Sequence, residues 1–68
     1  MKDLVLATTI NITKKLNKRT LSVQEIMNNA QNAGITYADW RGILNILCNE
    51  KKLYFAGDIV RVPADLLA

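Results

Sequence analysis

The chain has 68 residues and half of them are hydrophobic, which suits one small domain with a single compact core. Its formal net charge of +3 favours an anionic partner only mildly. It has no apolar run of about 18 residues that could span a membrane and no signal-peptide pattern. One cysteine without any histidine excludes an internal disulfide and a Cys/His zinc site. We therefore expect an intracellular protein, cytoplasmic or nuclear.

The segment from Lys2 to Asn17 is predicted to form the first helix. The β-branched run at 8–13 disfavours a helix, but the segment is long for a strand and lacks strict alternation. Cations near its end suit the negative end of a helix dipole. The predicted apolar stripe is Val5, Leu6, Ile10, Ile12 and Leu16, and the cations are Lys14, Lys15 and Lys18. The next three residues, 19–21, are expected to be extended and to add to the edge of a later hairpin.

Two capping signals predict the next two helices. Ser22 and Glu25 have the spacing of a capping box, in which each side chain bonds the other's backbone amide. Thr36 and Asp39 repeat that spacing. Gly34 is expected at the C-terminus of the first of these helices, with positive φ. Because only Ile35 separates Gly34 from Thr36, we expect the two helices to cross steeply. The first should bury Val23, Ile26, Met27 and Ala30 and expose Asn28, Asn29, Gln31 and Asn32.

A third helix is predicted from about Tyr37 to Asn49, with a core stripe of Trp40, Ile43, Leu44 and Leu47. Two strands follow at 53–55 and 59–62, joined by Gly57-Asp58 as a two-residue type II′ turn. Pro63 should end the second strand because it has no N–H to donate. The tail at 64–68 is expected to fray or pack loosely.

The predicted order is helix, short strand, helix, helix and hairpin, which is typical of a winged helix-turn-helix. This is an α+β fold, mainly α, with a small antiparallel β-hairpin as the wing. We expect residues 1–68 to form one such domain with its core at about 3–63.

The third helix is the candidate recognition helix, with outward positions that include Arg41, Asn45 and Asn49. Arginine can bond guanine edges and asparagine can bond adenine edges in a major groove. The alternative is that these residues are only a solvated face. Gly42 in mid-helix costs about 1 kcal/mol relative to alanine. It would either admit a close partner or relieve crowding beside Trp40.

Two basic groups are candidates for contacts with phosphates. The alternative is that they are ordinary solubilising charges. The acidic Asp58 at the hairpin tip makes deep insertion into a minor groove unexpected. One group, Lys51, Lys52 and Arg61, brackets the hairpin, and the other is Lys14, Lys15, Lys18 and Arg19.

The large aromatic residues have two possible roles. Rings can stack on bases in proteins that bind single strands, but Trp40 lies on the apolar stripe and is expected in the core. Alternation along a strand should turn one of Tyr54 and Phe55 inward, and the other is the better stacking candidate. Cys48 is interpreted as a small apolar filler. No phosphate-binding loop, paired-carboxylate site or Ser/His arrangement is found, so we expect a non-enzyme without cofactor or metal.

Five short runs stand out: 23–26 (VQEI), 30–35 (AQNAGI), 44–47 (LNIL), 51–54 (KKLY) and 60–62 (VRV). Together they resemble the C-terminal winged-helix domain of minichromosome maintenance helicases and the related domain in the middle subunit of replication protein A. In those domains a glycine is usual where Lys51 or Lys52 stands, and an aromatic residue where Ile59 or Val60 stands. The resemblance implies an accessory domain that modulates a helicase or contacts a loading factor, with the ATPase elsewhere.

Two hypotheses follow. The first is a non-catalytic module of the replication type that docks on a replication protein, binds DNA weakly, or does both. The second is a free-standing DNA-binding regulator, for example from a phage or other mobile element, which Met1 and the net charge of +3 would fit. Such a regulator would act as a homodimer, because one small module covers little DNA.

Overall fold

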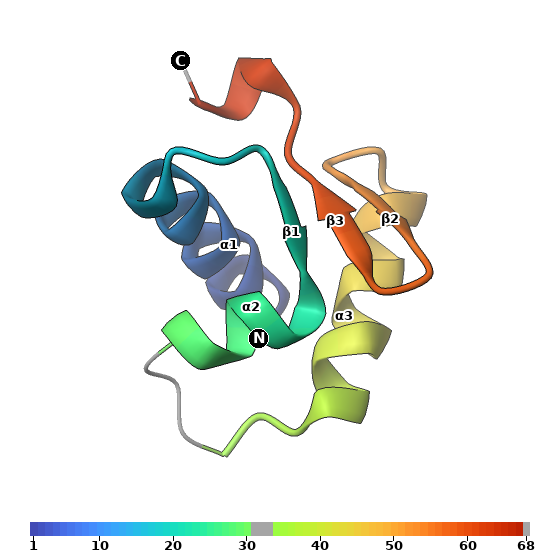
Figure 1. The fold of residues 1–68 in the computed structure, drawn as a ribbon. Helices are drawn as coiled ribbons and strands as arrows, with labels where there is room; N and C mark the ends of the chain where they lie inside the picture. The colour runs from blue at the N-terminus through green and yellow to red at the C-terminus, as the bar shows by residue number, and fades with distance from the viewer. Residues whose placement is uncertain (31–33, 68) are drawn as a thin grey trace.

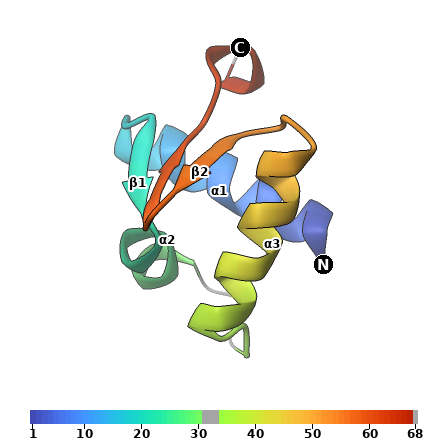
Figure 2. The same ribbon diagram turned by 90° about the vertical axis from the view of Figure 1, so that its right-hand side faces the viewer.

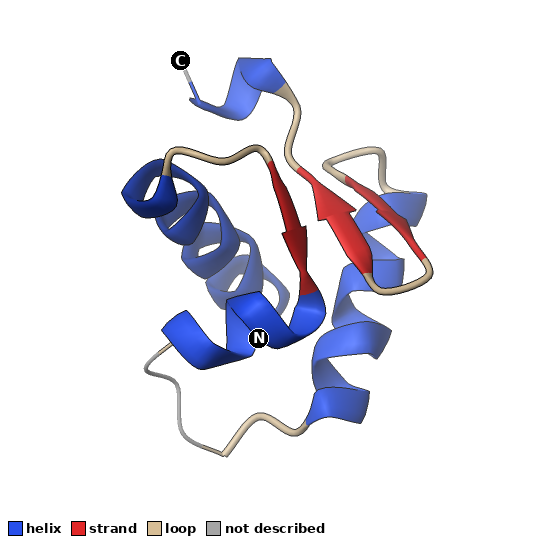
Figure 3. Ribbon diagram, viewed as in Figure 1, coloured by secondary structure: helices blue, strands red, loops and turns tan. Residues whose placement is uncertain are grey.

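The computed structural model describes residues 1–30 and 34–67, in which three α-helices pack against a three-stranded antiparallel sheet (Figure 1). Figure 3 shows that helix predominates, so the predicted α+β, winged-helix-like fold is confirmed. No helix in the described ranges is long and apolar enough to cross a membrane. In chain order the elements are α1 (Lys2–Leu16), β1 (Thr20–Ser22), α2 (Val23–Asn29), α3 (Tyr37–Asn49), β2 (Tyr54–Ala56), β3 (Ile59–Arg61) and the short 3₁₀ helix η1 (Ala64–Leu67).

The sheet has the order β1-β3-β2, so the short first strand joins the edge of the hairpin as predicted. Ala56 pairs with Ile59, which leaves Gly57 and Asp58 as the two-residue turn. Gly57 has φ of 60°, whereas Asp58 is not in the positive-φ region. This combination matches the predicted type II′ turn, in which only the first central residue needs positive φ.

The core lies between the three helices and the inner face of the sheet. Trp40, Leu44 and Leu47 on α3 are buried, which confirms the core interpretation of Trp40. Leu21, Val60 and Phe55 form one cross-strand row that faces this core. The other fully buried apolar residues of the cluster include Val5, Val23, Ile26 and Leu53. Alternation along the strands therefore turns the neighbouring rows to solvent.

The buried face of α1 differs from the predicted stripe. Val5 and Ile12 are buried as expected, but Leu6, Ile10 and Leu16 are only half-buried. Thr9 and Thr13 lie in the core instead. Their hydroxyls donate to the carbonyls of Val5 at 2.8 Å and Thr9 at 2.9 Å. Because these bonds satisfy the hydroxyls within the helix, the two threonines can be buried at positions where hydrophobic periodicity would predict apolar residues.

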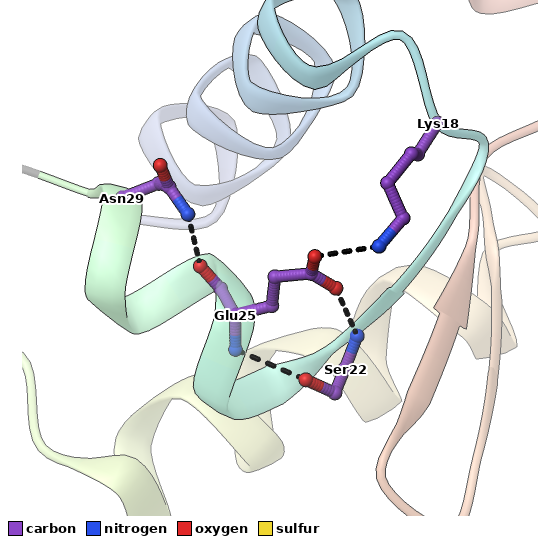
Figure 4. Close-up of polar contacts among 4 residues, drawn as sticks. All are labelled: Lys18, Ser22, Glu25 and Asn29. Carbon is purple, nitrogen blue, oxygen red and sulfur yellow. Dashed lines mark hydrogen bonds and ion pairs between the residues drawn. The ribbon is translucent and has the colours of Figure 1, made fainter.

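The capping box of α2 forms as predicted (Figure 4). The Ser22 hydroxyl accepts from the Glu25 amide at 3.0 Å, and the Glu25 carboxylate accepts from the Ser22 amide at 3.4 Å. Thr36 likewise accepts from the Asp39 amide at 3.1 Å and caps α3. Asn28 is exposed as expected, but Asn29 is half-buried and donates to the Glu25 carbonyl at 2.8 Å.

The predicted joint between α2 and α3 is wrong in its length. Gly34 does have positive φ, at 97°. However, α2 ends at Asn29 and is capped by Ala30 in an extended conformation, so residues 30–36 connect the helices. The last turn of α2 ends on Asn28 and Asn29, which have low helix propensity and offer little apolar surface to bury. The exposure expected for Gln31 and Asn32 falls outside the described residues.

The C-terminal tail is better ordered than predicted. Residues 64–67 form η1, which contacts α1, and Leu66 and Leu67 are half-buried. Leu66 and Leu67 supply apolar surface that this segment can bury.

Lys51, in the turn between α3 and β2, has φ of 62°, a conformation that glycine adopts at lower cost. This is one of the two positions at which the resembling domains usually have glycine.

Candidate nucleic-acid interface

The guanidinium of Arg41 is held against the hairpin. Its Nη1 donates to the Gly57 carbonyl at 3.1 Å and forms an ion pair with Asp58. The guanidinium carbon also lies 5.7 Å and 5.4 Å from the ring centroids of Tyr37 and Phe55. Tyr37 donates to the same Asp58 carboxylate. Reading a base edge with Arg41 would therefore require several of these contacts to break.

The rest of the exposed face of α3 carries little positive charge. Asn45 and Asn49 are exposed as predicted, and Asp39 adds a negative charge in the first turn. At its C-terminus Glu50 accepts from the Lys2 ammonium at 2.6 Å. This hydrogen bond, with the charge of the Glu50 carboxylate, raises the pKa of Lys2. Within the described residues, α3 thus presents no cation that is free of an ion pair.

Gly42 is not required by the fold. A Cβ at this position would meet no atom within 4 Å, and its φ is not positive. The alternative that Gly42 relieves crowding beside Trp40 is therefore wrong. The open space over Gly42 leaves the approach of a partner as its remaining interpretation.

The two predicted basic groups lie at the same end of the sheet. The cross-strand pairs join Thr20 to Arg61 and Arg61 to Tyr54, so the start of β1, the end of β3 and the start of β2 lie together. Arg19 directly precedes β1, Lys51 and Lys52 lie just before β2, and Lys14 and Lys15 end α1. Figures 1 and 2 both place the α1–β1 connection, the α3–β2 connection and η1 at the upper end of the molecule. We call this end, with the exposed row Thr20, Arg61 and Tyr54, the basic end.

Most cations at the basic end are not neutralised. Of the nine Lys and Arg side chains, Lys2, Lys18 and Arg41 form ion pairs. The other six form none within the described residues, and all six belong to the basic end: Lys14, Lys15, Arg19, Lys51, Lys52 and Arg61. Lys18 lies beside them, but its ammonium binds Glu25 at 2.6 Å (Figure 4).

Tyr54 is the aromatic residue that points outward. Its side chain is 64% exposed, whereas Phe55 packs against the core. Tyr54 and Arg61, which pair across β2 and β3, line a hollow of about 400 Å³. Arg19 lines the same hollow and donates from Nε to the Val62 carbonyl at 3.4 Å. The remaining lining residues are Pro63, Ala64 and Asp65.

Arg19 also lines a second hollow, of about 460 Å³, at the C-terminal end of α1. This hollow is lined by two further cations, Lys14 and Lys18, and by Thr13, Asn17 and Leu67. Arg19 is therefore common to both hollows. The sequence predicted that the two basic groups could contact phosphates together, and the strand register adds that Tyr54 lies beside them.

The remaining candidates are Cys48 and the acidic side chains. Cys48 is half-buried, with its Sγ 3.7 Å from the Phe55 carbonyl, in agreement with a filler role. The described residues contain no group of three or more His, Cys, Asp or Glu side chains placed to hold a metal ion.

Comparisons of the chain with protein-family models, with curated proteins and with solved structures found no match. The resemblance to replication-type winged-helix domains therefore depends on the short runs of sequence alone.

Proposed function

We propose that this chain is a non-catalytic module of winged-helix type that docks on a protein partner through the exposed face of α3. The observation that carries the proposal is the engagement of Arg41 with the hairpin. A helix without a free cation is poorly suited to lie between two phosphate backbones. The replication setting is part of the proposal and is supported by the resemblance of the short runs described above.

The exposed face of α3 has the character of a protein-docking surface. Ile46 is half exposed and lies one turn from Gly42, where the backbone is open to a partner. Centres of protein interfaces are depleted in charged residues, and this face is largely uncharged. The uncharged exposed positions on this side of the helix are Ala38, Gly42, Asn45, Ile46 and Asn49, and Asp39 is exposed in the first turn.

The alternative of a DNA-reading regulator fits these contacts less well. Such a regulator would present the N-terminal half of α3 and the hairpin turn to DNA. That region carries Asp39 and Asp58, and both side chains are exposed. The Asp39 carboxylate would weaken binding to phosphates by repulsion, whereas Asp58 is already paired with Arg41.

An affinity capture with three baits tests the docking face. The baits are the wild-type chain, Gly42→Arg on α3 and the matched control Asn11→Arg on the exposed side of α1. A partner retained by the wild type and the control but lost with Gly42→Arg supports docking through α3. Identical sets of retained proteins for all three baits would contradict it.

A further inference from the structure

We propose that the basic end of the sheet binds single-stranded nucleic acid, with an unpaired base on Tyr54 and phosphates on Arg61 and Arg19. This surface is separate from the face of α3, so the inference goes beyond the proposed docking function and does not depend on it. It follows from an exposed aromatic ring, unpaired cations beside it, and a hollow that they share.

The ring of Tyr54 is available for stacking. It stands on the outer face of the sheet, and its exposure of 64% exceeds that of Tyr37 on α3. Tyr37 is also engaged with Asp58 and Arg41, whereas no contact of this kind holds the Tyr54 ring within the described residues. Every base has a π-face, so a free ring beside cations binds single strands with little sequence preference.

The cations are placed to follow the backbone of a strand stacked on Tyr54. Arg61 is the cross-strand partner of Tyr54, and such partners have Cβ atoms about 5 Å apart. Arg19 lines the hollow next to Tyr54 and the hollow beside Lys14. A strand could therefore run from Tyr54 past Arg61 and Arg19 towards the end of α1. Asp65 lines the first hollow and would oppose this path.

The geometry favours a single strand over a duplex. Stacking on Tyr54 needs a base that is not held in a pair. Of the elements that would enter a groove, the start of α3 lies at the opposite end from η1 in both views (Figures 1 and 2). The hairpin turn lies at the other end of the β2–β3 ladder from Tyr54 and Arg61. At the basic end β1 and β2 begin and β3 ends, so the exposed row Thr20, Arg61 and Tyr54 lies there.

Fluorescence anisotropy tests the inference. The full chain is titrated into a labelled oligothymidine of about 15 nucleotides and, separately, into the same strand paired in a duplex. We expect the single strand to bind more tightly than the duplex. Tyr54→Ala should weaken binding to the single strand about tenfold or more, whereas Tyr54→Phe should retain it, because stacking on a ring contributes about 1–3 kcal/mol per base. The matched control Leu4→Ala removes an exposed side chain of α1 and should bind like the wild type.

The salt dependence tests the phosphate contacts separately. The plot of log K against log salt has a negative slope. Arg61→Ala should make this slope less steep by about 0.7, the value for one phosphate contact on a single strand. Asp65→Asn should tighten binding. The inference is overturned if no binding to the single strand is detected at about 50 mM salt. It is equally overturned if the duplex binds more tightly, or if Tyr54→Ala binds like the wild type while its unfolding transition is unchanged.

Discussion

Arg41 on α3 and Asp58 in the hairpin turn form an ion pair that joins the third helix to the wing. The same guanidinium donates to the Gly57 carbonyl and lies over the Phe55 ring. Asp58 also accepts from Tyr37 at the start of α3. The residue with the best chemistry for reading guanine is thus used to hold the wing in place. This one relationship moves the candidate nucleic-acid surface from α3 to the basic end of the sheet.

The first prediction concerns this ion pair. Arg41→Ala and Asp58→Ala should each lower the free energy of unfolding modestly, and their coupling energy should be at most about 1 kcal/mol, because both side chains are partly exposed. Urea denaturation of the two single variants and the double variant measures the coupling. Strictly additive losses would show that the pair does not stabilise the wing.

The second prediction contrasts two glycines. A Cβ would meet nothing within 4 Å at either Gly42 or Gly57, but only Gly57 has positive φ, at 60°. Gly42→Ala should therefore raise the free energy of unfolding by about 0.5–1 kcal/mol. Gly57→Ala should lower it, because alanine is strained at that φ. Urea denaturation checks both, and a destabilised Gly42→Ala would mean that the helix interior needs the glycine.

The third prediction concerns pH. The hydrogen bond from the Lys18 ammonium, helped by the Ser22 amide, lowers the pKa of Glu25 below its ordinary value of 4.5. A lowered pKa in the folded state stabilises the fold above the ordinary value, and this stabilisation is lost as pH falls through the folded pKa. Glutamine at this position can keep the capping box but not the charge. The difference in free energy of unfolding between wild type and Glu25→Gln, the stability gap, should thus be constant near neutral pH. It should shrink as the pH falls below about 4.5.

Thermal unfolding of both proteins across this pH range measures the gap. A gap that stays constant down to acid pH would show that the charge of Glu25 is not the stabilising feature.

The fourth prediction concerns the buried threonine on α1. The Thr9 hydroxyl donates to the Val5 carbonyl, which already lies within the hydrogen-bonded helix. Thr9→Val removes the hydroxyl, keeps the volume and leaves no buried group unsatisfied, so the free energy of unfolding should be unchanged or higher. Thr9→Ser keeps the hydroxyl but loses a buried methyl group and should cost about 1 kcal/mol. Urea denaturation distinguishes them, and a large loss with valine would show that the hydroxyl itself is needed.

Local signals predicted the element boundaries well where a side chain or a special φ defines them. Thr36 marks the start of α3, and Gly57-Asp58 marks the turn, because each needs only its own neighbours to form. The end of α2 has no such signal, and Gly34 was too distant to provide one. Thr9 and Thr13 were missed because their hydroxyls are satisfied inside the helix, which hydrophobic periodicity does not register.

The candidate site was harder to predict than the fold. The sequence shows that Arg41 and Asp58 have opposite charges, but only the packing of the wing on α3 brings them together. Similarly, Arg19 and Arg61 are distant in sequence and become neighbours only through the antiparallel register of β1 with β3. Long-range packing therefore decides which cations are free and where they gather.

An NMR titration of the full chain with single-stranded and duplex oligonucleotides tests the central claim, that the basic end and not α3 faces nucleic acid. We expect amide shifts on adding the single strand at Arg19, Tyr54 and Arg61, with the α3 amides of Gly42 and Asn45 unmoved. Shifts confined to α3 and the hairpin turn, with the basic end silent, would contradict the account.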